Sequence, residues 1–101
     1  YASGEVALKV AAARDIALIL DTIYASPYDI ELNYDFDLSK FVVKISADKV
    51  EIYDSSFSSP ESDPTLASYN FVPVDDKPNF PLLNQPKKIV FKKERGVLTV
   101  T

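Results

Sequence analysis

The chain has 101 residues, a net charge of -4 and no His, Cys, Met or Trp. A chain of this length is expected to form a single domain, residues 1–101, that buries enough apolar surface to fold without disulfides or metal. The lack of cysteine excludes a disulfide framework and a thiolate metal site, and the acidic balance argues against nucleic-acid binding, which needs a basic surface. The lack of histidine excludes the usual Ser–His nucleophile.

The first predicted element is a helix over residues 4–25. Of the 19 residues from Val6 to Tyr24, 14 are apolar, which exceeds what a helix with one buried face needs. Ser3 is the expected N-cap, and Glu5 precedes Lys9 by four residues, the favourable spacing for an ion pair. Pro27 disfavours helical geometry at the residue before it and ends the element.

The helical segment is not expected to cross a membrane, because each charged residue at the centre of a span costs about 2.5 to 3.5 kcal/mol. The charges in this segment are Lys9, Arg14, Asp15 and Asp21. The chain starts at Tyr1 and has no methionine, so we expect its start codon upstream. A membrane contact is therefore expected only through an upstream anchor.

The apolar surplus of the helix predicts two contact surfaces, one for its own sheet and one for another protein. One stripe follows steps of four and three through Val6, Val10, Ala13, Ala17, Leu20 and Tyr24. Other apolar residues of the helix are more than one side of a sheet can cover. They form the expected assembly face, which consists of Leu8, Ala11, Ala12, Leu18 and Ile19. We expect this face to bind protein subunits, possibly copies of the same chain.

From Tyr28 onward the period of apolar residues changes from helical spacing to two. Residues 28–37 alternate strictly between apolar and polar side chains, the pattern of a strand with one face on a core and one in water. Alternation resumes at Phe41 and again at Val50, across the short connection Ala47–Asp48, which predicts a hairpin. These three consecutive strands are expected to form an antiparallel meander.

The segment Ser55–Ser68 breaks the alternation with six serines and two prolines. It is expected to be a long mobile loop that buries little apolar surface. A strand over residues 69–74 would be restricted to an edge or an end by Pro73, and residues 75–86 are expected to be irregular. Gly96 supplies the positive φ that a short hairpin loop requires between strands over residues 88–93 and 97–101.

Two charged regions were weighed as candidate sites. Asn33, Asp35, Asp37 and Ser39 resemble the start of a calcium loop, but Leu38 stands at the glycine position and Lys44 at the position of the bidentate Glu. A solvated strand face is favoured, so no metal or other cofactor is expected. The basic group over residues 87–95 could hold an anionic surface, but a charged solvated hairpin is the commoner meaning. The acidic and basic regions are expected to neighbour each other or to face water.

The stretch Ala13–Phe36, ARDIALILDTIYASPYDIELNYDF, resembles archaeal membrane-anchored surface proteins of pilin-associated type. A long N-terminal apolar helix that runs through Ser-Pro into antiparallel strands is similar to the soluble part of type IV pilin-like proteins. The resemblance implies a structural or accessory component of the cell envelope, whose helix packs beside other helices and whose sheet faces outward. The class III signal segment and the anchoring half of the helix are expected upstream of Tyr1, and the disulfide loop of many bacterial pilins cannot form without cysteine.

The expected fold is α+β, with one long N-terminal helix packed on an antiparallel β-meander sheet of five to six strands over residues 28–101. The leading functional hypothesis is a noncatalytic subunit of a cell-surface filament or secretion assembly. The alternative is a monomeric extracellular module that binds a partner through the 55–68 loop. The predicted core consists of Ile16, Leu20, Ile23, Ile30, Leu32, Tyr34, Phe36, Phe41, Val43, Ile45, Val50, Ile52, Ile89, Phe91, Leu98 and Val100.

Overall fold

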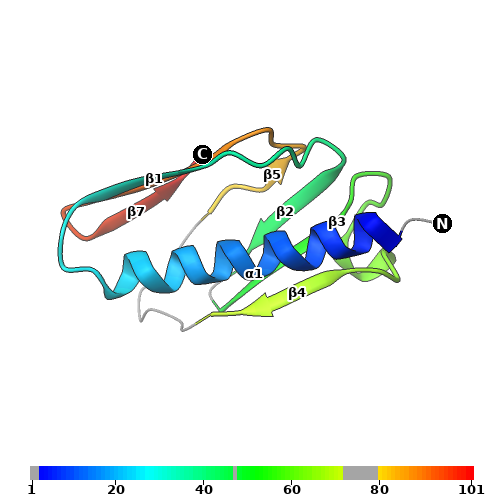
Figure 1. Cartoon of the computed structure of the whole chain (residues 1–101), viewed down its shortest axis with the longest axis horizontal. Helices are drawn as coiled ribbons and strands as arrows, with labels where there is room; N and C mark the ends of the chain where they lie inside the picture. Colours follow the sequence, from blue (N-terminus) through cyan, green and yellow to red (C-terminus); the bar gives the residue numbers. More distant parts are fainter. Residues whose placement is uncertain (1–2, 47, 72–79) are drawn as a thin grey trace.

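The computed structural model describes residues 3–46, 48–71 and 80–101, and for residues 3–5 it describes the backbone alone. The element order is α1 (Ser3–Ala25), β1 (Ile30–Tyr34), β2 (Phe41–Ile45), β3 (Lys49–Asp54), the 3-10 turn η1 (Pro60–Ser62), β4 (Ala67–Asn70), β5 (Leu83–Asn84), β6 (Ile89–Glu94) and β7 (Val97–Val100). The fold is α+β, as predicted: one long helix lies across antiparallel sheets (Figure 1).

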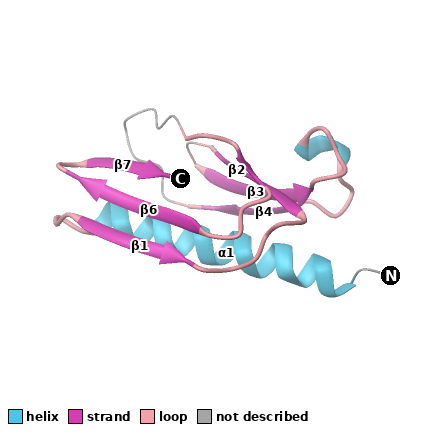
Figure 2. Cartoon of the chain, turned by 90° about the horizontal axis from the view of Figure 1, so that it is seen from above, coloured by secondary structure: helices cyan, strands magenta, loops and turns pink. Residues whose placement is uncertain are grey.

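The described strands form two sheets, where one sheet of five to six strands was expected. The first sheet has the order β1-β6-β7, and the second has the order β4-β3-β2-β5. The predicted hairpins β2–β3 and β6–β7 are both present. The predicted meander is wrong at its first strand, because β1 pairs with β6 and not with β2. Residues between β1 and β2 carry the chain from one sheet to the other (Figure 2).

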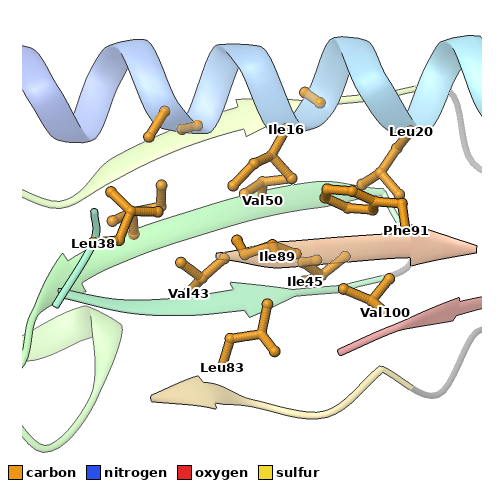
Figure 3. Close-up of a cluster of buried hydrophobic side chains, with 14 of the residues drawn as sticks. Ile16, Leu20, Leu38, Val43, Ile45, Val50, Leu83, Ile89, Phe91 and Val100 are labelled. Carbon is orange, nitrogen blue, oxygen red and sulfur yellow. The ribbon is translucent and has the colours of Figure 1, made fainter. Parts of the chain in front are cut away.

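α1 packs against β3 and β4 and also covers the inner face of the three-stranded sheet. Figure 3 shows the resulting core, in which Ile16 and Leu20 of the helix meet Val50 of one sheet and Phe91 of the other. All sixteen predicted core residues are buried or pack against this cluster. The cluster also contains seven residues outside the predicted core, Ala12, Ala13, Ala17, Leu38, Ala67, Phe71 and Leu83.

The helix ends where it was predicted to end, and a residue from the far end of the chain caps it. Lys93 of β6 donates hydrogen bonds from Nζ to the carbonyl oxygens of Ile23, at 3.2 Å, and Ser26. The last turn of α1 contains no basic residue of its own. A cation placed at the carbonyl end of a helix is stabilised by the helix dipole, so Lys93 fixes α1 to the three-stranded sheet.

Residues 69–86 differ in part from their predicted structure. β4 begins at Ala67, earlier than expected, and the backbone N–H of Phe71 extends the pairing by donating to the carbonyl of Asp48 at 2.9 Å. The short strand β5 lies inside the segment expected to be irregular. The remainder of these two predictions, residues 72–79, lies outside the described residues.

Candidate functional site

The solvent side of α1 carries large apolar side chains. The sequence predicted them, because the helix has more apolar residues than one buried face needs. Leu18, Val10 and Leu8 are 54%, 48% and 41% exposed, and Ala11 lies half-buried among them. We call this set, Leu8, Val10, Ala11 and Leu18, the α1 outer surface. The continuous stripe predicted for the helix included Val10, but Val10 is exposed, whereas Ala13, Ala17 and Leu20 of that stripe are buried in the core.

Ala12 was predicted to belong to the assembly face, and the structure places it in the core with none of its surface exposed. Ile19, also assigned to that face, packs against the core at its margin. The reason is that two sheets contact the helix, so its buried arc is wider than one sheet would cover. Of the five predicted residues, only Leu8, Ala11 and Leu18 therefore remain on the outer surface.

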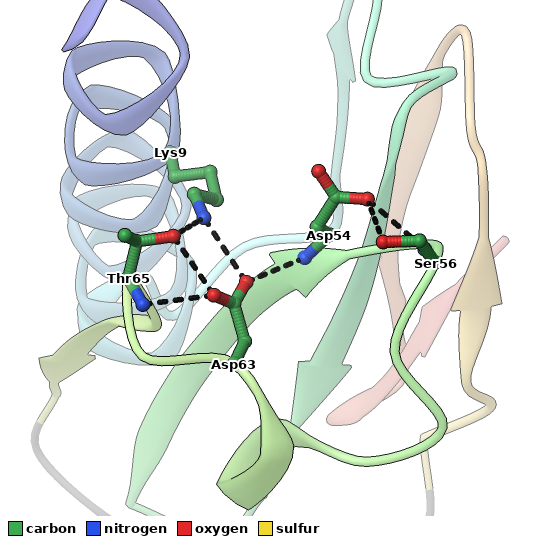
Figure 4. Close-up of polar contacts among 5 residues, drawn as sticks. All are labelled: Lys9, Asp54, Ser56, Asp63 and Thr65. Carbon is green, nitrogen blue, oxygen red and sulfur yellow. Dashed lines mark hydrogen bonds and ion pairs between the residues drawn. The ribbon is translucent and has the colours of Figure 1, made fainter. Parts of the chain in front are cut away.

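A buried, multiply hydrogen-bonded polar group joins the N-terminal half of α1 to the 55–68 segment (Figure 4). The ammonium of Lys9, 2% exposed, lies 3.1 Å from Oδ2 of buried Asp63 and donates a second bond to the Thr65 hydroxyl. Oδ2 of Asp63 also accepts the backbone N–H of Asp54 at 2.8 Å. Oδ1 accepts the backbone N–H and the hydroxyl of Thr65, both at 2.8 Å.

These contacts decide the charge of Asp63. Burial by itself raises the pKa of this carboxyl, but hydrogen bonds from the Asp54 and Thr65 backbone, the Thr65 hydroxyl and Lys9 outweigh burial and hold the pKa well below its ordinary value. Lys9 also lies over the ring of Phe41, with its Nζ 6.0 Å from the centroid. The group is thus a buried ion pair that fixes structure, and none of its buried side-chain N or O atoms lacks a hydrogen-bond partner.

The 55–68 segment was expected to be a loop without burial, and this expectation is wrong. The segment contains η1, and Pro60, Asp63 and Ala67 are buried. The sequence spans 54 residues between Lys9 and Asp63, so no local pattern shows their pairing. A weak signal was present: Asp63 stands two residues before Thr65, the spacing at which a carboxylate accepts a backbone N–H and forms a turn. Lys9 therefore forms its ion pair with Asp63. The sequence had suggested Glu5 as the partner, and the side chain of Glu5 lies outside the described structure.

The acidic strand face shows no metal-binding geometry. Asn33, Asp35 and Asp37 are exposed, and Oδ1 of Asp37 accepts the backbone N–H of Ser39 at 3.0 Å. Hydrogen bonding by the side chain of Ser39, and then by its backbone N–H, lowers the pKa of Asp37. Within the described ranges, no cluster of three or more His, Cys, Asp or Glu residues could hold a metal ion.

The acidic and basic regions are neighbours, one of the two arrangements expected. β1 pairs with β6 so that Glu31 lies opposite Lys92. At the end of the same sheet, the carboxylate of Asp29 accepts the backbone N–H of Arg95 at 3.0 Å. The basic hairpin is thus partly neutralised by its own sheet, which reduces its potential as an anion-binding surface.

The remaining aromatic residues mostly belong to the core. Phe71 is buried and stacks on Tyr24 with ring centroids 6.4 Å apart, and Phe80 packs at the edge of the core. Tyr34 donates its hydroxyl to Oδ2 of Asp15 at 3.0 Å. Burial first, and then this contact with Asp15, raises the pKa of Tyr34 well above its ordinary value.

Two surface depressions can be described, and both are small. One, of about 220 Å³, lies over the paired strands β1 and β6, and the other, of about 150 Å³, lies beside Leu8 and Phe41. Pockets that enclose small molecules usually have volumes of roughly 300 to 1,000 Å³. Neither depression has the size of a substrate site.

No known protein family, curated protein or solved structure matches this chain. Among the described residues, no helix combines the length and the hydropathy that a bilayer crossing requires.

Proposed function

We propose that this protein is a noncatalytic subunit that associates with other protein chains, including copies of itself, through the α1 outer surface. The observation that carries the proposal is the exposure of three large aliphatic side chains, Leu8, Val10 and Leu18, on the part of α1 that the sheets leave uncovered. Scattered apolar residues are ordinary on protein surfaces, but apolar side chains gathered along one element mark contact surfaces.

The shape of the surface suits a second helix. Ala11, and Ala7 four residues before it, present small side chains on the same side of α1 as Leu18, so the backbone of a partner helix could approach closely there. A helix of 23 residues is about 34 Å long and offers several turns for such packing. Lys9 and Lys93 fix α1 to the sheets near both ends, so the outer surface is presented on a rigid support.

We assign this subunit to a cell-surface assembly of type IV pilus-like organisation, in the envelope or outside the cell. This part of the proposal is supported by the resemblance of Ala13–Phe36 and by the arrangement of one long helix on antiparallel strands.

The proposal is tested by placing a charge on the α1 outer surface. Leu18→Glu should weaken self-association about tenfold or more, because it removes an apolar contact and buries a charge, while it changes the free energy of unfolding by about 0.5 kcal/mol. Sedimentation velocity over a range of concentrations measures the association, and urea unfolding measures the stability.

Ser58→Glu is the matched control, since Ser58 is exposed and lies in the 55–68 segment. It should leave the association unchanged. If Ser58→Glu abolishes the association and Leu18→Glu does not, the partner binds at the 55–68 segment and the proposal is wrong. Ala12→Glu is unsuitable as a test, because a charge at this buried position would disrupt the core.

A further inference from the structure

We propose that the outer edge of β7 is a strand-pairing site, and that its partner is β7 of a second copy of this chain in antiparallel orientation. The site lies on a sheet edge and is independent of the α1 outer surface. It would join two three-stranded sheets into one sheet of six strands.

Alternate residues of β7 direct their backbone N–H and C=O groups toward β6 and toward the outer edge. Thr101 and Val90 exchange both of their backbone hydrogen bonds, each at 3.0 Å. In an antiparallel ladder, hydrogen-bonded pairs alternate with pairs that share no hydrogen bonds, so the backbone groups of Val97 and Thr99 also face β6. The N–H and C=O groups of Leu98 and Val100 consequently point away from β6, toward the outer edge.

The outer edge of β7 has no paired strand among the described residues, because β7 ends the sheet order β1-β6-β7. Unpaired backbone groups along an edge are a template for another strand, and proteins usually block them with charges, prolines or a covering element.

The other edges of the two sheets carry such protection, whereas β7 does not. β1 contains Glu31, β5 has two residues and stands between Pro81 and Pro86, and β4 is packed against α1. The sequence from Gly96 to Thr101, GVLTVT, has no charged residue and no proline. Four of its six residues are Val or Thr, which favour strand geometry.

The outer edge of β7 is complementary to itself in antiparallel orientation. With Leu98 opposite Val100 of the second copy, the outward N–H and C=O groups of both chains are paired, and a two-fold axis passes beside Thr99. Thr99 then faces Thr99 of the second copy on the exposed face, a favourable cross-strand pair. Val97, 63% exposed, comes to lie opposite Thr101 of the second copy. No like charges face each other across the new junction.

A charge-exchange experiment tests this pairing with the 101-residue chain. Thr99→Lys or Thr99→Glu alone places two like charges opposite each other across the two-fold axis, so each variant should dimerise about fivefold more weakly at low salt. An equimolar mixture of the two variants should restore dimerisation as a heterodimer. Sedimentation velocity measures the dimer, and thermal melting confirms that both variants fold. Asn33→Lys, on the exposed face of β1, is the control and should dimerise like the unchanged protein.

Hydrogen exchange provides a second readout that is specific to the backbone. The amides of Leu98 and Val100 should become protected as the protein concentration rises, whereas the Thr99 amide, bonded to β6, should be protected at every concentration. Concentration-independent exchange at Leu98 and Val100 would overturn the proposal. So would dimerisation that is unchanged in both Thr99 variants, which would place the contact elsewhere, whereas loss of association in Leu18→Glu alone bears only on the α1 outer surface.

Discussion

Three aspartates of this molecule form the same local turn, in which the side chain accepts a backbone hydrogen bond. The carboxylates of Asp37, Asp54 and Asp63 each accept the backbone N–H of the residue two positions later. Two of these turns are exposed, and only at Asp63 does the second carboxylate oxygen reach a buried lysine. The same short motif therefore serves as an ordinary turn twice and as the anchor between helix and sheet once.

At this scale we predict that Asp63→Ala destabilises the fold by about 3 to 5 kcal/mol, because the ammonium of Lys9 would remain buried without its carboxylate. Lys9→Met should cost less, since Asp63 keeps three hydrogen bonds. Urea unfolding at neutral pH measures both losses. Equal losses of unfolding free energy in the two variants would contradict the larger role of Asp63.

The Asp63 contribution should also depend on pH. Because the folded protein lowers the pKa of Asp63, the contribution is fully present above the pKa of the unfolded chain, about 4, and is lost progressively as the pH falls below that value. The stability difference between the unchanged protein and Asp63→Asn should thus shrink between pH 7 and pH 2. A difference that stays constant over this range would show that the charge of Asp63 is irrelevant.

Among the elements, the β6–β7 hairpin has the best-defined turn chemistry. Arg95 and Gly96 connect the strands with φ of 53° and 81°, and positive φ at both central residues is the property of a type I′ turn. Such turns match the right-handed twist of the strands they join. Gly96 suits its position, as the sequence predicted, and Arg95 is held there although a side chain disfavours positive φ.

We therefore expect opposite effects at the two turn positions. Gly96→Ala should destabilise the protein by about 1 kcal/mol through backbone strain alone, because no atom lies within 4 Å of the added Cβ. Arg95→Asn should stabilise it by a few tenths of a kcal/mol, since Asn tolerates positive φ better. Thermal melting of both variants is the measurement. A stabilising Gly96→Ala would contradict the assigned turn.

For the whole molecule, the decisive feature is that one helix closes two sheets over a common core. Phe91 of the three-stranded sheet and Val50 of the four-stranded sheet are fully buried in the same cluster beneath α1. We expect both sheets to unfold together, because separating either would expose this cluster.

Phe91→Ala should accordingly lower the stability of both sheets by the same amount, about 3 to 5 kcal/mol. Native-state hydrogen exchange at Val50 and Ile89 measures the two sheets separately. If only Ile89 loses protection, the sheets are independent units and the shared core does not couple them.

The local patterns of this sequence determined most of the elements and the identity of the core. Alternation with a period of two depends only on the pleat of a strand, so it revealed β1, the β2–β3 hairpin and the inward residues of β6 without knowledge of their partners. The end of the helix at Pro27 and the positive φ at Gly96 likewise follow from backbone sterics within a few residues.

Only the tertiary structure decided which elements meet. The partner of β1 is β6, some 60 positions away, and the partner of Lys9 is Asp63. No local periodicity shows either pairing, although the opposite charges of residues 29–37 and 87–95 were compatible with the first. Ala12 shows the same limit at the candidate assembly face: helical spacing placed it near Leu8 and Ile19, but the position of the second sheet determines how wide an arc of α1 is buried. Packing across long sequence distances is a property of the whole chain, because each contact depends on all the elements that share the core.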